Sequence, residues 1–309
     1  MSFTDQNTLA EVAAQQLSDA PIIAPQFESV SPRWLCHLLE WVPVKSGYFR
    51  ARKVREGRAI SFPAHQQEWR EMPNAFVRYE ENPRIYNLRA VCTVLDVHTA
   101  EADLYGIPHE MYDEHLHLVT ETIKERQESE LINNREFGLV HNVATQQRMS
   151  TRTGPPTPDD LDGLLAKVWN EPSFFLLHPA AIAAFGRECT NKGIVPSSIS
   201  LFGSQFLTWR GVPLIPSDKM PVDDEKTKIL LLKIGRKRQG VVGLHQLGLQ
   251  DEISPGLSAR FVGMSEEAIA SYLVTFHFSL AILVDNAAAM LENVELGHYY
   301  GFESRPKDT

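Results

Sequence analysis

The chain has 309 residues, of which 43% are hydrophobic and 22% are charged, and its formal net charge at pH 7 is −9. This length accommodates two domains or one large one, and the composition is that of an ordinary globular protein. The acidic balance argues against a container for nucleic acid, because binding phosphate polyanions requires a basic surface.

Three features of the chain bear on its compartment. The first residues carry no basic side chain ahead of an apolar run, so they do not form a secretory signal. The longest apolar stretch, Ala268–Val284, is interrupted by polar residues and is too short for a membrane helix. Cys36, Cys92 and Cys189 are isolated in apolar contexts, which favours buried free thiols over a disulfide framework or a zinc site. We therefore expect a soluble protein of the reducing cytoplasm, with no membrane partner.

The segment from Met1 to about Val30 predicts an arm. Residues Thr8–Leu17 place apolar side chains at helical spacing, and a proline-flanked extended strip follows them. A helix this short, joined to a strip that contains Ile22, Ile23 and Phe27, needs another surface to lie on. The alternative is a frayed tail, which those apolar residues disfavour.

A basic hairpin is predicted next. Residues Tyr48–Arg55 and Arg58–Phe62 have the composition of strands and are joined at Glu56-Gly57. The basic residues of this hairpin are Arg50, Arg52, Lys53, Arg55 and Arg58. A β-ribbon that enters a nucleic-acid groove is basic in the same way, so the hairpin could bind nucleic acid. The net negative charge of the whole chain disfavours that interpretation.

Two helices are predicted after the hairpin. The first runs from Asn82 to about Tyr105. Its apolar face would contain Ile85, Leu88, Cys92 and Leu95. The second runs from Glu110 to about Asn134, and its polar middle contains two cation-first i,i+4 pairs, Lys124 with Glu128 and Arg126 with Glu130. A helix that is polar over so much of its circumference is either solvated or a surface for another chain.

Two short helices are predicted after a proline-rich turn. Thr157 is suited to cap the first helix and Pro158 to open it, and the acidic residues that follow favour the positive end of its dipole. Its buried stripe would be Leu161, Leu164, Leu165 and Val168. The second helix begins at Pro179 and ends at Gly193, where glycine supplies a left-handed cap. Its buried residues would be Ile182, Phe185 and Cys189.

The remaining sequence predicts mainly strands. They are expected at Ile199–Thr208, Val212–Ile215, Lys228–Ile234 and Gly240–Leu244, and the last two would close a hairpin around residues 236–239. Residues 271–284 fit both an alternating strand and a helix face. We favour the strand, because aromatic and branched residues dominate there. A short helix is expected at Asn286–Leu291.

The sequence carries no recognisable catalytic motif. The GxGxxG, HExxH and GxSxG patterns are absent, and Gly235–Gly240 lacks the ending of a phosphate loop. His115 and His117 face opposite sides of a helix, as residues two apart do, so they cannot chelate one metal together. His178 is interpreted as a helix-entry residue, because no serine or cysteine is placed by the sequence as its nucleophile. We therefore expect no catalytic, cofactor-binding or metal-binding residue.

Four blocks of the sequence carry a family resemblance. They are Lys124–Asn133, Thr157–Gly193 with Phe174-Phe175-Leu176-Leu177-His178-Pro179 at its centre, Ser200–Gly203, and Trp209–Ser217. Through these blocks the chain resembles the family 2A encapsulin shell proteins, which are associated with a cysteine desulfurase and were formerly called major membrane protein I. The similarity extends from about Val12 to about Val294.

The resemblance implies the α+β fold of Hong Kong 97-type phage major capsid proteins. In that fold residues 1–30 would form an N-terminal arm. Residues 31–180 would form the P-domain, with an extended hairpin loop at about 44–80 and a spine helix at about 110–134. Residues 181–260 would form the A-domain, and residues 261–309 the P-domain return and the C-terminal tail.

The resemblance also implies a function. The chain would assemble with itself into a closed icosahedral cage of about sixty copies. The cage would enclose a cysteine desulfurase and serve sulfur metabolism or storage, with pyridoxal phosphate on the cargo enzyme only and no nucleic acid inside. Two alternatives remain, namely a prophage capsid subunit that packages DNA and a soluble oligomeric enzyme.

Candidate site residues follow from the same resemblance. The expected intersubunit contacts are Tyr48, Arg50, Arg52 and Arg55 in the hairpin and Ile22, Ile23 and Phe27 in the arm. The candidate pore loop is the turn Asn191, Lys192 and Gly193, because five copies of Lys192 around one opening would form a cationic ring. No residue is assigned to cargo docking.

Overall fold

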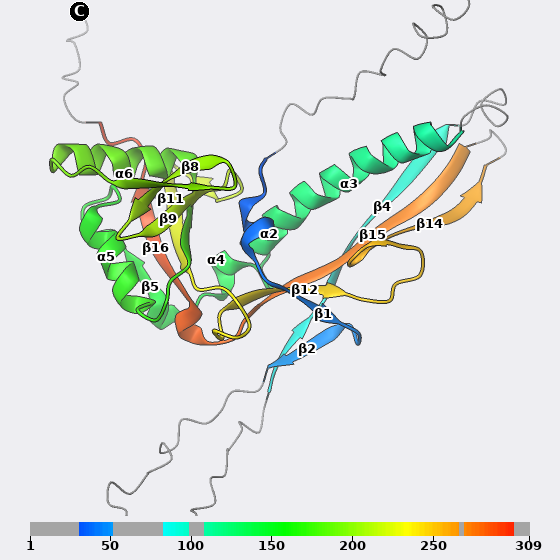
Figure 1. Cartoon of the computed structure of the whole chain (residues 1–309), viewed down its shortest axis with the longest axis horizontal. Coiled ribbons are helices and arrows are strands. Elements are labelled where there is room, and N and C mark those ends of the chain that lie inside the picture. The colour runs from blue at the N-terminus through cyan, green and yellow to red at the C-terminus, as the bar shows by residue number, and fades with distance from the viewer. Residues whose placement is uncertain (1–30, 52–82, 99–107, 266–268, 300–309) are drawn as a thin grey trace, which may run out of the picture. The chain divides into compact units, whose positions relative to one another are not determined.

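The fold is described from a computed structural model of the chain. The structure describes residues 31–51, 83–98, 108–265 and 269–299 (Figure 1). All described elements belong to the unit that spans Ser31–Thr309.

One sheet has eight strands. In spatial order they are β5 (Arg148–Ser150), β16 (Ala288–Glu295), β11 (Lys226–Leu232), β6 (Phe174–Leu177), β9 (Val212–Pro216), β8 (Ser204–Trp209) and β7 (Ser197–Leu201), and β10 (Val222–Asp223) also pairs with β11. The central strands β6 and β11 contain unbroken apolar runs and are buried on both faces. Such runs are typical of strands that are covered on both sides.

Two helices cover one face of this sheet, α5 (Pro158–Lys167) and α6 (Pro179–Asn191). Successive strand residues point to opposite faces. Phe175 and Leu177 of β6 accordingly pack with the buried side chains of α5 and α6, whereas Phe174 and Leu176 join a second core cluster on the other face. The eight-stranded sheet is therefore the middle layer of three.

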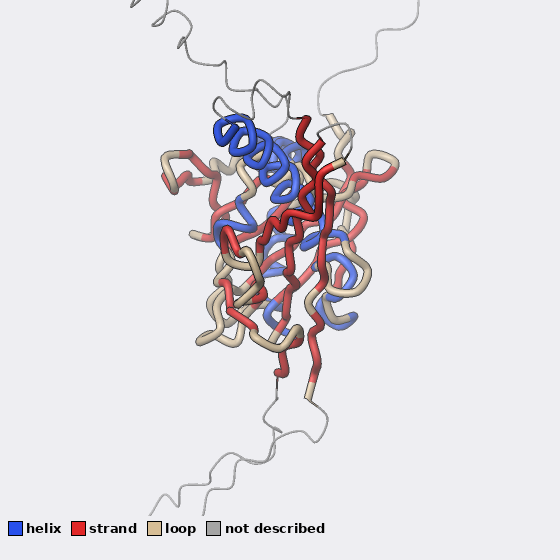
Figure 2. The backbone as a smooth tube through the Cα atoms, turned by 90° about the vertical axis from the view of Figure 1, so that its right-hand side faces the viewer, coloured by secondary structure: helices blue, strands red, loops and turns tan. Residues whose placement is uncertain are grey.

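A second sheet has six strands. They are β1 (Trp41–Val44), β12 (Val241–Gln246), β15 (Ile269–Ile282), β14 (Leu257–Met264) and β13 (Glu252–Ser254) in order, and β4 (Arg89–His98) also pairs with β15. The helix α3 (Pro108–Asn133) lies along β4 and β15 (Figures 1 and 2). Leu131 and Ile132 of this helix share the second core cluster with Phe276 and Phe278 of β15.

Short elements complete the described fold. They are α2 (Trp34–Leu38), α4 (Leu139–Asn142), two 3₁₀ turns (Thr145–Gln147 and Asp285–Ala287), and a two-stranded ribbon of β2 (Tyr48–Ala51) with β3 (Arg84–Asn87). Phe49 and Tyr86 of the ribbon pack against Val42, Leu244 and Ala281. The ribbon is therefore seated on the six-stranded sheet at its base.

Several predictions from the sequence are confirmed. The long polar helix, the strand at β15 and the helix that begins at Pro179 are all present. The Oγ1 atom of Thr157 accepts a 3.2 Å hydrogen bond from the Asp160 N–H, and an Asp160 carboxylate oxygen accepts a 3.1 Å bond from the Thr157 N–H. This reciprocal capping box satisfies backbone donors at the start of α5. Gly193 follows α6 with a φ of +67°, as a left-handed helix cap requires.

The predicted helix at residues 82–105 is wrong within the described residues. Residues 84–87 form β3, and β4 pairs with β15 in an antiparallel register from Arg89 opposite Phe278 to His98 opposite Ile269. The helical spacing of apolar residues is overridden, because cross-strand packing decides strand formation. Cys92 is consequently exposed and Cys36 only half-buried, so the expectation that all three thiols are buried holds for Cys189 alone.

The predicted helix at residues 286–291 is also wrong. A 3₁₀ turn ends at Ala287, and β16 begins at Ala288 and lies between β5 and β11. An alanine-rich segment favours a helix when it is isolated, but tertiary pairing overrides this weak preference. Ala288 and Ala289 are fully buried, each facing a different core cluster.

Two connections between strands differ from their predictions. The predicted strand at 199–208 is a hairpin, because Phe202 and Gly203 have φ values of 51° and 77° and form a two-residue turn between β7 and β8. The predicted hairpin of residues 228–244 does not form, since β11 belongs to the eight-stranded sheet and β12 to the six-stranded sheet. The chain crosses between the sheets near Gly240, where an added Cβ would lie 2.4 Å from the Lys233 carbonyl oxygen.

The predicted basic hairpin is partly described. Its first strand is present at Tyr48–Ala51, but the partner is β3 rather than Arg58–Phe62. Residues 52–82 lie outside the described residues.

Candidate functional site

The β2–β3 ribbon is the described root of the predicted intersubunit loop. Tyr48 is 40% exposed, and the guanidinium of Arg50 lies 4.9 Å above the centre of its ring. On the opposite strand the Tyr86 hydroxyl donates a 2.6 Å hydrogen bond to the Ile282 carbonyl, and burial raises the pKa of Tyr86 so that it remains a donor. The ribbon thus presents a stacked aromatic and cationic pair outward from a firmly attached base. Of the expected contacts, Arg52, Arg55, Ile22, Ile23 and Phe27 lie outside the described residues.

The candidate pore loop lies at the carboxyl end of α6. Asn191, Lys192 and Gly193 are exposed, and an added Cβ at Gly193 would meet nothing within 4 Å. The Lys192 Nζ lies 3.5 Å from a carboxylate oxygen of Asp159, near the amino end of α5. The charge of Lys192 is therefore partly compensated within the subunit.

The polar side of α3 differs from its prediction. Lys124 pairs with Glu121 at 3.1 Å rather than with Glu128, whereas the predicted pair of Arg126 and Glu130 is present at 3.0 Å. Glu128 is buried, with 1% of its surface exposed. The helix is therefore covered in part by its own chain. The sequence analysis did not predict that the carboxyl of Glu128 is buried.

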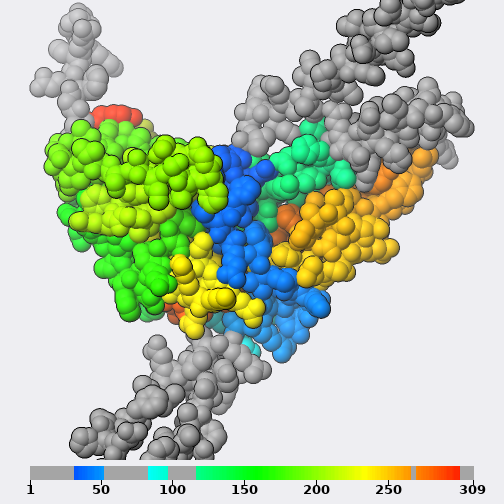
Figure 3. Space-filling view, viewed as in Figure 1, coloured from blue at the N-terminus to red at the C-terminus, as the bar shows by residue number. Residues whose placement is uncertain are grey.

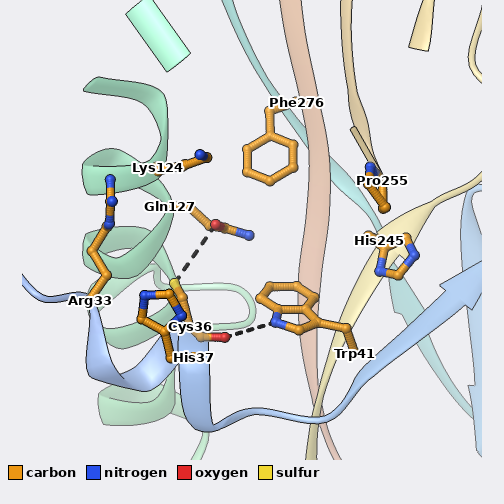
Figure 4. Close-up of a pocket in the computed structure, with 9 residues that line it drawn as sticks. All are labelled: Arg33, Cys36, His37, Trp41, Lys124, Gln127, His245, Pro255 and Phe276. Atoms are coloured by element: carbon orange, nitrogen blue, oxygen red, sulfur yellow. Dashed lines mark hydrogen bonds between the residues drawn. The ribbon is translucent and has the colours of Figure 1, made fainter. Parts of the chain in front are cut away.

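A cavity of about 340 Å³ opens between α2, α3 and the six-stranded sheet (Figure 4). The Cys36 thiol lies 3.7 Å from the Gln127 side-chain oxygen, and Trp41 donates a 2.9 Å hydrogen bond to the Cys36 carbonyl. Burial raises the pKa of Cys36 strongly and lowers that of His245. A neutral thiol and a neutral imidazole among aromatic rings do not form a nucleophile–base pair, because the reactive species would be the thiolate.

The described histidines and basic residues do not assemble a reaction centre. The ring nitrogen Nδ1 of His178 accepts a 3.2 Å hydrogen bond from the Ala180 N–H, so His178 caps α6 as predicted. His117 is exposed. The side chains of His109 and His115 lie outside the described residues. At the Gly235–Gly240 turn, the Arg236 N–H donates a 2.9 Å hydrogen bond to Glu40.

Metal sites and membrane spans are absent from the part of the chain that the structure describes. No group of three or more His, Cys, Asp or Glu residues is placed there to hold a metal ion. None of the described helices is long and apolar enough to cross a bilayer.

The fold matches solved capsid subunits. A structure of Microbacterium phage Oxtober96 aligns with a TM-score of 0.60 over 90% of this chain and 98% of that chain, at 13% identity, which is a likeness of fold alone. The cryo-EM structure of the holo-SrpI encapsulin complex from Synechococcus elongatus PCC 7942 aligns with a TM-score of 0.82 over 94% of this chain and 98% of that chain, at 54% identity. The molecule therefore has the Hong Kong 97-type fold of shell-forming proteins.

Sequence comparison narrows this class to one family. The model for the type 2A encapsulin shell protein SrpI-like family matches residues 48–298. The type 2A encapsulin shell protein SrpI of Synechococcus elongatus is 54% identical over 297 residues, which cover 96% of this chain and 97% of SrpI. The chain belongs to the type 2A encapsulin shell proteins and is a structural protein of a nanocompartment rather than an enzyme.

Proposed function

We propose that the chain builds a closed icosahedral shell of about sixty copies around a cysteine desulfurase, in the bacterial cytoplasm, for sulfur metabolism or storage. The observation that carries this proposal is the near-complete alignment with a subunit of the holo-SrpI encapsulin complex. A holo complex is a loaded one, so a relative at 54% identity supports a cargo for this chain as well. The cysteine desulfurase follows from the family resemblance, and pyridoxal phosphate would travel with that enzyme.

The proposed contacts between subunits are made by the arm and by the extended loop. The β2–β3 ribbon supports this role, because its base is anchored while Tyr48 and Arg50 are directed outward. Arginines at 50, 52 and 55 would meet an acidic neighbour, since each copy carries a net charge of −9. In the arm, Ile22, Ile23 and Phe27 would cover apolar surface on an adjacent copy.

The turn Asn191–Gly193 is proposed to line an opening at the fivefold axes. Its exposure and the left-handed conformation of Gly193 support a projecting turn. Because Asp159 lies beside Lys192, the ring of charge around the opening would be weaker than five free lysines. A mild preference for small anions follows.

The cargo proposal is tested by co-expression. The chain is produced with an untagged cysteine desulfurase from the same organism, and the particles are isolated by sedimentation. We expect the enzyme and its pyridoxal phosphate absorbance to sediment with the particles and to resist added protease. The control is the same enzyme without its disordered extension, which should sediment separately. Particles that form normally but exclude the intact enzyme would refute the cargo while leaving the shell in place.

A further inference from the structure

The buried carboxyl of Glu128 lies beneath the first described residues of the chain. One carboxylate oxygen accepts a 3.0 Å hydrogen bond from the Ser217 hydroxyl. The other, Oε2, is buried without a hydrogen-bond partner among the described residues, although the Cys36 backbone amide lies close enough to favour the ionised form. A buried carboxylate with an unmatched oxygen is costly, whereas a carboxylic acid needs less solvation.

Residues 31–39, here called the strap, lie across α3 and over this carboxyl. The Ser31 backbone N–H and hydroxyl both donate to Glu125, at 3.1 Å and 2.8 Å. Arg33 pairs with Glu121 at 2.6 Å. On its other side, the Trp34 ring meets Phe206 of β8 edge to face, with centroids 5.2 Å apart. In the space-filling view the strap is the upper blue segment beside α3 (Figure 3).

The cations near Glu128 are already committed to other carboxylates. Lys219 pairs with Asp218 at 2.7 Å and with Glu125 at 3.0 Å. The charged and titratable groups around Glu128 are Glu121, Lys124 and Glu125 on α3, Arg33, Cys36 and His37 on the strap, and Asp218 and Lys219 after β9. Burial is the largest cause that raises the pKa of Glu128, Glu125 and Asp218 also raise it, and Ser217 and the Cys36 amide lower it, so that the pKa moves from 4.5 to about 7. A proton on Glu128 therefore removes a negative charge from a site that already holds Glu125.

We propose that Glu128 is a proton-operated latch for the strap: the protonated side chain keeps residues 31–39 seated on α3, and loss of the proton loosens them. Opening of the strap returns Glu128 to water, where it ionises readily. Rising pH therefore favours the open strap. This inference concerns the subunit itself and adds to the proposed function.

The size of the effect follows from proton linkage. The pKa of Glu128 is about 7 when the strap is closed and returns to the ordinary value of 4.5 when the strap is open. The opening constant should then increase about ten-fold between pH 6 and pH 8, and about seventy-fold between pH 5 and pH 8, before levelling off. The change is complete once the pH exceeds the closed-state value, because Glu128 is then ionised in both states.

Hydrogen exchange of the full-length protein tests the latch. The readout is the protection of amides at the strap, including Leu39, whose N–H bonds to the Leu35 carbonyl at 3.0 Å, corrected for the intrinsic pH dependence of exchange. We expect protection to fall about ten-fold from pH 6 to pH 8 in the wild type. Glu128→Gln should abolish this fall, because an amide cannot lose a proton in this range. Glu130→Gln changes an acid that pairs with Arg126 on the same helix and should leave the fall intact.

A second variant keeps the test decisive if Glu128→Gln folds poorly. Ser217→Ala removes the hydroxyl that favours the ionised carboxylate, so the midpoint of the transition should move to higher pH. Wild-type protection that stays constant between about pH 5 and pH 8 would overturn the proposal, and so would an unchanged fall in Glu128→Gln. Amide protection of the strap can be measured in particles and in unassembled subunits alike. The latch can therefore be tested whether or not the shell proposal is correct.

Discussion

We predict that removing the extended loop leaves the fold of the subunit intact and prevents assembly. Ala51 and Arg84 are paired residues of the β2–β3 ribbon, so the chain can be closed directly beyond them. The variant deletes residues 53–82 and carries Arg52→Asn and Pro83→Gly, which gives a two-residue turn of the kind that hairpins favour. The ribbon base, with Phe49 and Tyr86 on the six-stranded sheet, is retained.

The shortened loop should stabilise the isolated subunit, because a shorter connection costs less entropy to close. Replacing the connection of residues 52–83 by two residues lowers the entropy cost of loop closure by about 2.5 kcal/mol, from the logarithmic dependence on loop length. The intersubunit contacts that we propose for the loop would be lost at the same time. We therefore expect a folded subunit whose thermal unfolding temperature is unchanged or higher, and which does not assemble.

Size-exclusion chromatography and electron microscopy separate these effects. The deletion variant should elute as a small species without hollow particles, while its circular dichroism and unfolding remain cooperative. The control is the full-length chain with Arg52→Asn and Pro83→Gly, which loses one of the proposed contacts but keeps Arg50, Arg55 and the rest of the loop, and should still form particles. Normal particles from the deletion variant would refute the reasoning that this loop joins neighbouring subunits.

Two further predictions concern folding and the proposed opening. Thr157→Ala should lower the free energy of unfolding by about 1 kcal/mol, because it removes one half of the capping box of α5, whereas Thr157→Ser should change it little; chemical denaturation measures both. Lys192→Glu breaks an exposed ion pair with Asp159 and should cost less than about 1 kcal/mol, leaving assembly intact. The same variant should slow the entry of small anions into purified particles relative to wild type, and equal entry rates would exclude a role for Lys192 in an opening.

Local signals in the sequence predict local structure well here. The capping box at Thr157 and the alternation along β15 depend on neighbouring residues, and both features are present. The strands β4 and β16 depend on partners far away in the chain, so local sequence predicts helices there: the apolar spacing does so for β4 and the alanine-rich composition for β16. These segments form strands because each finds a strand to pair with, β15 for β4 and β11 for β16.

The burial of Glu128 also depends on residues far away in the chain, although one local signal points to it. Its hydrogen-bond donor, Ser217, is 89 residues away in the sequence, which no local pattern reveals. However, Glu128 lies three and four residues before Leu131 and Ile132, both fully buried, and therefore on the apolar side of α3. A single acidic residue on an apolar helix face was the available signal. For the proposed intersubunit contacts the sequence offered only the apolar arm and the basic hairpin, because the surface that would meet them belongs to a second copy.

The most direct test of shell formation by this chain is electron microscopy of the protein purified without any partner at physiological salt. Family membership predicts closed hollow particles of uniform size, which elute far ahead of a 34.9 kDa monomer on a sizing column. A folded monomer or dimer with no particles in the images would contradict the account.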